Sequence, residues 1–272
     1  MSEQLYTTLN NGIQMPLLGL GVYDMHSKEA EQAMQTAFEI GYRLIDTAAM
    51  YNNEVEVGNA VRNSGIKRND LFITTKLNNP DHGYNSTLRA FDESMKKLNI
   101  DYIDLYLIHW PIKGKRKDTW KALEYLYTTK QVRGIGVANY LVPFLKELEG
   151  YSTVVPTVNQ VEFSPFLYLK DLEAVCKEKN IQLQSYTPLT HGKKLNDKRL
   201  LSVAAKYHKT AAQIILRWNM QHGISAIPKS VKRERLEENF DIFDFDINEE
   251  DMNLLDNLNE NFRVVGDPIH MF

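Results

Sequence analysis

The sequence has a single cysteine, Cys176, in 272 residues, so an intramolecular disulfide framework is excluded. The run around it, DLEAVCKEKN, has helical spacing, and we expect Cys176 to be a small apolar filler. Neither sign of charge is in large excess, because the net charge is -3 and the isoelectric point is near 6.2. This balance excludes a global basic field for nucleic acid or anionic membranes and favours a small-molecule partner.

Long hydrophobic runs are also missing. No apolar run approaches the roughly 18 residues that a helix needs to cross a bilayer. The first residues, MSEQLYTTLNNG, have neither a basic leader nor an apolar core, so they do not predict a secretory signal. We therefore expect a cytoplasmic protein that does not bind membranes, and the sequence predicts no metal site.

Linkers rich in glycine, proline or serine are absent as well, and there is no internal repeat beyond an alternation of strands and helices. The composition, 43% hydrophobic and 25% charged, is sufficient for a large core. A single domain over residues 1–272 is the simplest interpretation.

The strand pattern begins with a hairpin at residues 5–15, whose Asn11-Gly12 pair suits the positive φ angles of a tight turn. Eight further apolar, β-branched runs follow, and most are typical of strands buried on both faces. These predicted strands are 17–22, 42–46, 71–76, 103–109, 132–138, 156–162, 181–186 and 224–228.

Helical periodicity fills the intervals between the predicted strands. The clearest helical stretches are 27–40, 54–65, 87–99 and 119–130, with two more, 198–207 and 210–222, before the last strand. Eight βα units in this length predict an α/β fold, a closed (β/α)8 TIM barrel with an N-terminal β-hairpin.

An extra C-terminal helix at 247–259 and an irregular tail from Asn261 complete the predicted fold. The tail contains Phe262, Met271 and Phe272, which we expect to pack against the barrel. A tail that reaches the catalytic rim can form one wall of a substrate pocket.

A doubly wound dinucleotide-binding sheet is the alternative fold, suggested by Gly19 and Gly21. That fold requires G-x-G-x-x-G, but residue 24 is Asp24, so we reject it. We expect the two glycines to mark a close approach of the backbone to another group.

The stretch YRLIDTAAMYNNEVEVG, residues 42–58, places Asp46 at a strand end and Tyr51 in the following loop. Lys76 and His109 end the next two predicted strands. The carboxyl ends of barrel strands share one rim, so we expect these side chains to meet. His109 shares a strand face with Leu105 and Leu107, which predicts that it looks over the barrel interior.

These four residue types suit protonation of a carbonyl or alkoxide oxygen. The ordinary pKa of a tyrosine is near 10, and a cation such as Lys76 close by can lower it by roughly one to three units. Asp46 would keep Lys76 charged, and His109 would orient the oxygen being protonated.

A second cluster, ISAIPKSVKRERLEEN at residues 224–239, predicts an anion site. Lys229 and Ser230 follow the last strand, and a helix starts among Lys232, Arg233 and Arg235. Helix N-termini with basic side chains bind phosphate, and phosphate sites recur after the eighth strand of barrels. Arg235, Glu238 and Asn239 would share one helical face and could contact an adenine and its ribose phosphate.

Taken together, these segments resemble the aldo-keto reductase family from Met15 to the tail. The resemblance is carried by LLGLGVY, YRLIDTAAMYNNEVEVG, ITTK, DLYLIHWP, VRGIGVAN, PTVNQVEFSP, SYTPL and IPKSVKRERLEEN. It implies a barrel that binds NADPH rather than NADH, acts on a small-molecule carbonyl substrate, and is a monomer or a weak dimer.

The resemblance also implies roles for individual residues. Asp46, Tyr51, Lys76 and His109 match the catalytic tetrad, with Tyr51 as the general acid. The matched cofactor positions are Gly21, Val22, Tyr23, Asn139, Gln160, Tyr186, Leu189, Lys229, Ser230, Val231, Arg235, Glu238 and Asn239. Among them Asn139 and Gln160 would hold the carboxamide, Tyr186 would stack on nicotinamide, and Lys229, Ser230 and Arg235 would contact the 2'-phosphate. The matched substrate positions are Tyr23, Tyr51, His109 and Trp110.

Three positions depart from the family pattern: Ala138 stands where serine is common, Tyr23 where tryptophan is common, and SYTPLTHG introduces Thr187 and Thr190. Substrate choice is expected from the segments 110–118, 188–199 and the tail. The first contains the basic residues Lys113, Lys115, Arg116 and Lys117, which suggest a preference for acidic substrates or are simply solvated.

Two other functions remain open from the residues alone. One is a Schiff-base aldolase with Lys76 as nucleophile, which would need an uncharged lysine. The other is a non-catalytic subunit that senses a nucleotide.

Overall fold

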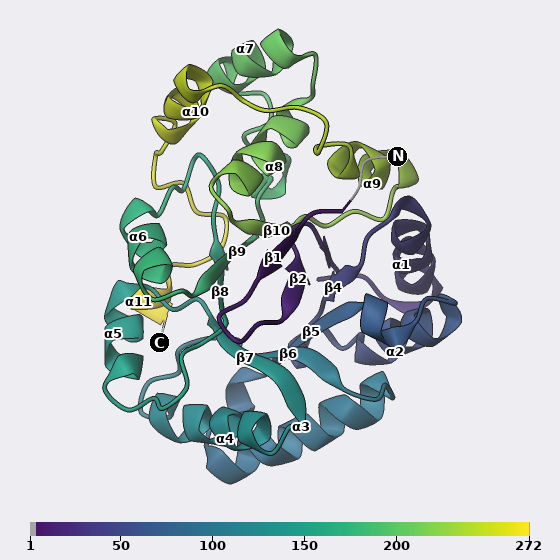
Figure 1. Ribbon diagram of the computed structural model, residues 1–272, viewed down its shortest axis with the longest axis vertical. Coiled ribbons are helices and arrows are strands. Elements are labelled where there is room, and N and C mark those ends of the chain that lie inside the picture. Colours follow the sequence, from purple (N-terminus) through teal and green to yellow (C-terminus); the bar gives the residue numbers. More distant parts are fainter. Residues whose placement is uncertain (1–3, 272) are drawn as a thin grey trace.

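A computed structural model describes residues 4–271, and the side chain of Met271 and the residue Phe272 lie outside what it describes. Eight parallel strands form a barrel that is surrounded by helices, as predicted (Figure 1). The N-terminal hairpin consists of β1 (Tyr6–Thr8) and β2 (Gln14–Pro16). The barrel strands are β3 (Leu20–Gly21), β4 (Leu44–Asp46), β5 (Phe72–Leu77), β6 (Ile103–Ile108), β7 (Val132–Ala138), β8 (Val158–Glu162), β9 (Gln182–Tyr186) and β10 (Ser225–Ile227). The α-helices are α1 (Ser27–Ile40), α2 (Glu54–Asn63), α3 (Tyr84–Leu98), α4 (Arg116–Thr128), α5 (Val142–Glu149), α6 (Lys170–Glu178), α7 (Lys198–Tyr207), α8 (Ala211–Gln221), α9 (Arg233–Phe240), α10 (Glu249–Asp256) and α11 (Pro268–Met271).

The strands follow one another around the barrel in chain order, from β3 to β10. The two end strands meet through backbone bonds, because the amide of Gly19 donates to Ala226 O at 2.9 Å and the amide of Ala226 donates to Leu17 O at 2.8 Å. The carboxyl ends of all eight strands therefore face one rim.

The barrel interior and the space under the helices form two separate cores. Leu105 and Leu107 of β6 belong to the interior core, whereas Tyr106 packs toward the helices. This alternation confirms the predicted facing of the strand that leads to His109. Leu9 and Met15 of the hairpin also join the interior core, so the hairpin closes the amino end of the barrel, where Figure 1 shows it across the ring.

The hairpin turn differs from the prediction. Only Gly12 has a positive φ, at 84°, whereas Asn11 does not. The amide of Gly12 donates to Leu9 O, which leaves Asn10 and Asn11 as the central turn residues. The loop is therefore longer than the predicted two-residue turn, and its glycine follows the turn.

The first predicted barrel strand, 17–22, is ordered as a strand only at Leu20–Gly21, with an isolated bridge from Leu18 to Ala226. The two glycines do mark close approaches. A Cβ on Gly19 would lie 2.2 Å from Leu44 Cδ2, and one on Gly21 would lie 2.8 Å from the Ile227 carbonyl oxygen. Larger residues here would push β3 away from its neighbours on both sides.

The C-terminal helix is present as α10, and the tail after it ends in the short α11. Phe262 packs against the larger core, as predicted for this side chain. The two predicted helices before the last strand are α7 and α8. Within residues 4–271, no helix is both long enough and apolar enough to cross a membrane.

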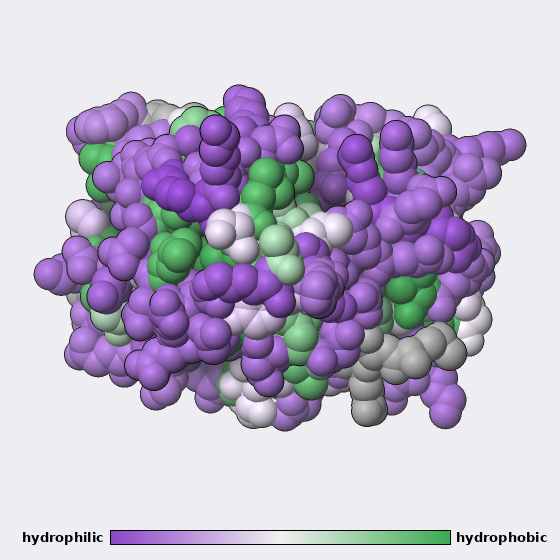
Figure 2. All heavy atoms as spheres, turned by 90° about the horizontal axis from the view of Figure 1, so that it is seen from above, coloured by the Kyte–Doolittle hydropathy of each residue, from purple (hydrophilic) through white to green (hydrophobic). Residues whose placement is uncertain are grey.

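The outer surface on the side of α7 and α10 is mostly hydrophilic, and its hydrophobic atoms are scattered over it in small areas (Figure 2). Helix α7 buries one face only, whereas every residue of α8 except Gln221 is buried. In α7, Leu200, Val203 and Ala204 are buried while the lysines and arginine point outward.

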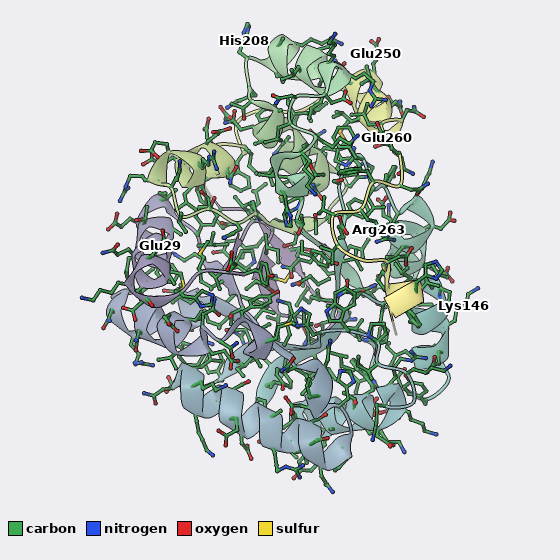
Figure 3. The ribbon with its side chains drawn as sticks, turned by 180° about the vertical axis from the view of Figure 1, so that it is seen from behind. Glu29, Lys146, His208, Glu250, Glu260 and Arg263 are labelled. Atoms are coloured by element: carbon green, nitrogen blue, oxygen red, sulfur yellow. The ribbon has the colours of Figure 1, made fainter. Side chains whose placement is uncertain are left out.

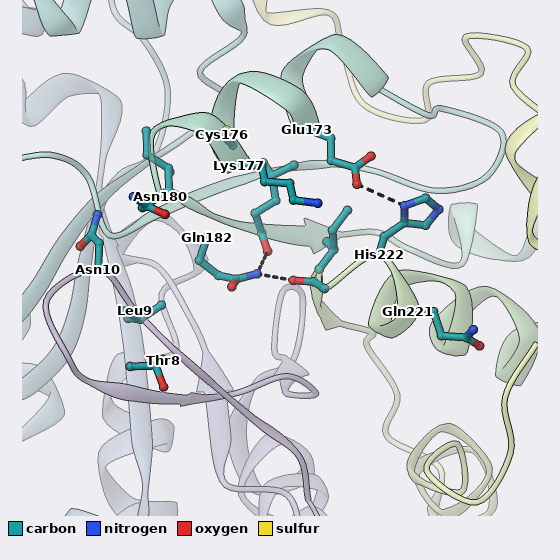
Figure 4. Close-up of a pocket in the computed structure, with 14 residues that line it drawn as sticks. Thr8, Leu9, Asn10, Glu173, Cys176, Lys177, Asn180, Gln182, Gln221 and His222 are labelled. Carbon is teal, nitrogen blue, oxygen red and sulfur yellow. Dashed lines mark hydrogen bonds and ion pairs between the residues drawn. The ribbon is translucent and has the colours of Figure 1, made fainter.

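A cavity of about 620 Å³ lies at the amino end of the barrel, between the hairpin and the ends of α6 and α8 (Figure 4). Several of its polar side chains are already bound by the protein. His222 contacts Glu173 at 3.1 Å and Asp256 at 2.9 Å, and Gln182 Nε2 donates to the carbonyls of Leu183 and Gly223. These contacts hold α6, α8 and α10 together.

Candidate active site

Lys76 lies at the centre of the predicted tetrad and has no solvent exposure. Its ammonium donates to Asp46 Oδ1 at 2.6 Å, to Thr47 O at 2.8 Å and to the Tyr51 hydroxyl at 3.5 Å. Three acceptors use all three of its hydrogens. This arrangement disfavours Lys76 as a free nucleophile and therefore disfavours the aldolase alternative.

Burial and mutual attraction act in opposite directions on the pair of Asp46 and Lys76. Burial raises the pKa of Asp46 and lowers the pKa of Lys76, and each charge partly reverses the shift of the other. Gln160 adds a second stabilising contact by donating to Asp46 Oδ2 at 2.7 Å. A buried charge with this many hydrogen bonds is the arrangement in which an ion pair persists.

The phenol of Tyr51 has a pKa well above 10, because burial, Asp46 and Tyr23 all disfavour the phenolate. The prediction that Lys76 lowers this pKa is therefore wrong in its net direction. Lys76 is placed to do so, but desolvation of the phenolate is the larger effect. Tyr51 consequently stays protonated and can donate its proton.

His109 lies beyond the end of β6 and is 7% exposed. Its ring contacts Tyr51 edge to face, with centroids 5.6 Å apart, and stacks near Trp110. Burial, Lys76 and His82 hold the pKa of His109 well below 6.5, so the imidazole is neutral. Tyr23 contacts Tyr51 from another side, with centroids 5.0 Å apart, and is largely exposed.

Asn139, Gln160 and Tyr186 lie beside the tetrad on neighbouring strands. Tyr186 donates its hydroxyl hydrogen to Asn139 Oδ1 at 2.7 Å, and Asn139 Nδ2 donates to His109 O at 2.9 Å. Gln160 Nε2 donates to both Asp46 and Gln184, so its amide hydrogens are used. Toward a ligand, Gln160 can therefore act only as an acceptor through its oxygen.

The predicted anion cluster lies at the start of α9, at the other end of the same cavity. Lys229 extends across the mouth and donates to Asp24 O at 3.2 Å. Arg233 is paired with Glu39 and Glu237, whereas no carboxylate within residues 4–271 pairs with Arg235. Arg235, Glu238 and Asn239 all line the cavity, as their shared helical face predicts.

One cavity of about 880 Å³ joins the two clusters. It is lined by all the predicted site residues except Lys76, Val22 and Val231. Lys76 contacts the cavity-lining Asp46 and Tyr51 from behind, while Val22 is fully buried and Val231 points outward.

The basic residues of the loop 113–117 lie apart from the cavity. Among the residues that the structure describes, none of Lys113, Lys115, Arg116 and Lys117 lines it. Arg116 instead pairs with Glu147 of α5 at 2.9 Å. The geometry gives no support to a direct role of this loop in selecting acidic substrates.

The loop after β9 carries backbone strain that the sequence did not reveal. Thr187, Thr190 and His191 all have φ near 51°, a region that β-branched residues rarely adopt. All but Thr190 line the cavity, and Thr190 is buried behind them. These are the threonines of the departing SYTPLTHG run, and only the turn chemistry of Gly192 signalled an irregular backbone there.

Several cavity residues were not predicted individually: Met50, His191, Leu195, Val264 and Val265. Val264 and Val265 belong to the tail that was expected to form a wall. Their contact with the barrel runs through Glu162, two residues after Gln160 on the same strand. The period of two along β8 was the available signal for Glu162.

Comparison with known proteins decides the family. The model of the aldo/keto reductase family matches residues 17–260. The chain belongs to the aldo-keto reductase family. Membership makes this chain an oxidoreductase that acts on carbonyl groups.

Similar aldo-keto reductases carry different names. The chain is 49% identical over 261 residues to the glyoxal reductase of Bacillus subtilis, covering 96% of this chain and 95% of the relative. It is 44% identical to the morphine 6-dehydrogenase of Pseudomonas putida, covering 96% and 93%. A solved mutant of Gox0644 in complex with NADPH has a TM-score of 0.94 and 37% identity, and the alignment covers 99% of both chains.

Proposed function

We propose that this aldo-keto reductase reduces aldehydes and ketones with NADPH, and that Tyr51 donates the proton to the carbonyl oxygen. The observation that carries the proposal is the hydrogen-bonded chain from Gln160 through Asp46 and Lys76 to Tyr51, which opens into one cavity. At the far end of this cavity lies Arg235, which pairs with no carboxylate within residues 4–271. The end of the cavity at Tyr51 suits a carbonyl group, and the end at α9 suits a phosphate.

The cavity fits NADPH by its chemistry. Lys229, Ser230 and Arg235 would hold the 2'-phosphate, and Arg235 has no carboxylate partner within residues 4–271 to compete with it. Asn139, Gln160 and Tyr186 would hold the nicotinamide end, where Gln160 offers an acceptor oxygen. When bound, NADPH supplies the hydride for the carbonyl carbon.

The side chains of the tetrad control the transfer of the proton. The high pKa of Tyr51 keeps its proton in place until a more basic oxygen forms beside it. Lys76, 3.5 Å from the phenol oxygen, then stabilises the phenolate that is left, and Asp46 stabilises the ammonium. Neutral His109 orients the carbonyl oxygen.

The substrate end of the cavity favours neutral carbonyl compounds. Tyr23, Met50, Trp110, Val264 and Val265 surround it. The lysine and arginine that line the cavity, Lys229 and Arg235, instead belong to the phosphate end. An apolar wall around one proton donor binds a small carbonyl by contact and orients it by one hydrogen bond.

The test is to follow the oxidation of NADPH, and separately of NADH, with aldehydes, α-ketoacids and dicarbonyls. We expect NADPH-dependent turnover that is fastest with neutral carbonyls. Binding of NADPH without turnover of any carbonyl would instead favour the nucleotide-sensing alternative. Borohydride trapping of a substrate on Lys76 would favour the aldolase.

A further inference from the structure

Glu162 is a buried carboxylate that neither the proton-donating site nor the phosphate end uses. It is the last residue of β8 and is 4% exposed. Its Oε1 accepts from the amide of Val264 at 2.6 Å, and its Oε2 accepts from the amide of Val265 at 3.2 Å. Two successive amides of the tail are thus bound by one side chain of the barrel.

The position of Glu162 connects the tail to the catalytic rim. Gln160, two residues earlier on the same face of β8, donates to Asp46. Glu162 is therefore one step nearer the mouth, and it binds Val264 and Val265 where both line the cavity. The tail wall and the catalytic carboxylate are held by neighbouring residues of one strand.

The rest of the tail is held from outside the cavity. The amides of Glu260 and Phe262 both donate to Phe166 O, and Glu260 pairs with Lys194 and Arg199 at 2.6 Å each. Glu260 and Arg263 are labelled in Figure 3, which views the molecule from the side opposite to Figure 1. Beyond Phe262, the backbone amides of Val264 and Val265 are bound to the barrel by hydrogen bonds to Glu162.

The surroundings of Glu162 offset part of the effect of burial, and its pKa is raised on balance. Burial raises the pKa of Glu162, while the two tail amides, Arg263 and Lys193 oppose that rise. Charge-assisted hydrogen bonds to backbone amides are about twice as strong as neutral ones, so a carboxylate here is a strong anchor.

We propose that Glu162 is a positioning residue for substrate selection, which holds Val264 and Val265 as the wall that a bulky carbonyl substrate contacts. A small substrate that reaches only Tyr51 and His109 does not use this wall. The inference rests on the proposed carbonyl reduction and adds to it a residue that acts through the tail.

The chain offers a matched control in Glu124 of α4. It is also buried, and its carboxylate also accepts from two successive amides, Thr153 at 2.5 Å and Val154 at 2.9 Å. These contacts lie outside the cavity lining. All of these amide bonds are accepted by Oε1, so Glu124→Gln keeps the acceptor and is a control for removing a buried carboxylate charge away from the cavity wall.

The experiment compares Glu162→Gln with Glu124→Gln, using methylglyoxal and phenylglyoxal as substrates that share the reacting dicarbonyl. Glutamine keeps the size but replaces one acceptor oxygen by a donor, which cannot bind an amide hydrogen. For Glu162→Gln we expect KM for phenylglyoxal to rise about tenfold, since losing contacts worth one charged hydrogen bond has that effect. We expect kcat for both substrates and KM for methylglyoxal to change less than about twofold on the same grounds.

Hydrogen–deuterium exchange of the tail gives a readout that does not need turnover. We expect faster exchange over residues 263–267 in Glu162→Gln and no change there in Glu124→Gln. Unchanged exchange, or an equal rise of KM for both substrates, would overturn the inference. If wild type reduced neither substrate, both the proposed function and the selection claim would fail, while exchange would still show whether Glu162 holds the tail.

Discussion

Lys76 depends on Asp46 for its charge, because it has no solvent exposure and Asp46 is its only carboxylate partner among the described residues. Removing one partner of a buried pair leaves an uncompensated charge, which costs about 3–5 kcal/mol. We expect Asp46→Asn and Lys76→Met each to lower the free energy of unfolding by roughly 3 kcal/mol. Urea denaturation of the double variant should show a loss well below the sum. Strictly additive losses would contradict the coupling.

His82 provides a test by pH. Burial lowers its pKa from 6.5 to about 4, and neither ring nitrogen has a hydrogen-bond partner within residues 4–271. As pH falls from 6.5 toward 4, the unfolded chain binds a proton that the folded chain does not, so stability is lost across that window.

The loss of unfolding free energy due to His82 should reach about 3 kcal/mol at the acid end of this pH window. The lowered pKa of His109 adds a loss in the same direction. Replacing His82 by leucine should flatten the dependence of the unfolding free energy on pH. Urea denaturation at several pH values measures it, and an unchanged slope would contradict the prediction.

Individual site residues were predictable where polar side chains recur at the ends of successive strands. Asp46, Lys76 and His109 each end a strand, and parallel strands bring such ends to one rim, so their meeting could be predicted. The direction in which the pKa of Tyr51 shifts could not be predicted, because it depends on how much water the folded cavity excludes. Glu162 was missed because its partners are 102 and 103 residues away in the sequence.

Helix α9 contains two arginines that look alike in the sequence but have different surroundings in the fold. Arg233 is paired with Glu39 and Glu237, whereas Arg235 lines the cavity. Because NADPH differs from NADH by the 2'-phosphate, we expect Arg235→Ala to weaken NADPH binding about tenfold or more and to leave NADH binding unchanged.

Arg233→Ala is the control for charge alone, since it removes the same charge from the same helix. Fluorescence titration of both variants with both cofactors gives the four dissociation constants. Equal weakening of NADPH binding by the two variants would mean that α9 acts only through its overall positive charge.

The type and order of the helices and strands were predictable from the sequence, but their lengths were less so. Most barrel strands lie within a few residues of the predicted runs, because buried parallel strands are continuously apolar. β3 is shorter than predicted, since Gly19 and Gly21 fit against Leu44 and Ile227 instead of adding side chains to the sheet. The positive φ angles of Thr187 and Thr190 were not predicted, because β-branched residues rarely adopt this region.

For the whole molecule, the two ends of the barrel are closed in different ways. The hairpin fills the amino end with Leu9 and Met15, which makes that end a core. At the carboxyl end, the loops and the tail leave a cavity between the tetrad and α9. The closed barrel could be predicted from eight βα units, whereas the path of the tail over the rim depends on distant contacts such as those of Glu162.

The central claim is that Tyr51 gives its proton to the carbonyl oxygen. The most direct measurement is single-turnover oxidation of NADPH by a neutral dicarbonyl, comparing wild type with Tyr51→Phe, with NADPH affinity measured separately by fluorescence. We expect the phenylalanine variant to bind NADPH as wild type does and to lose about 10²–10⁴-fold in the rate of turnover, as removal of a general acid does. Turnover within about threefold of wild type, with NADPH bound normally, would contradict the assignment of Tyr51 as the general acid.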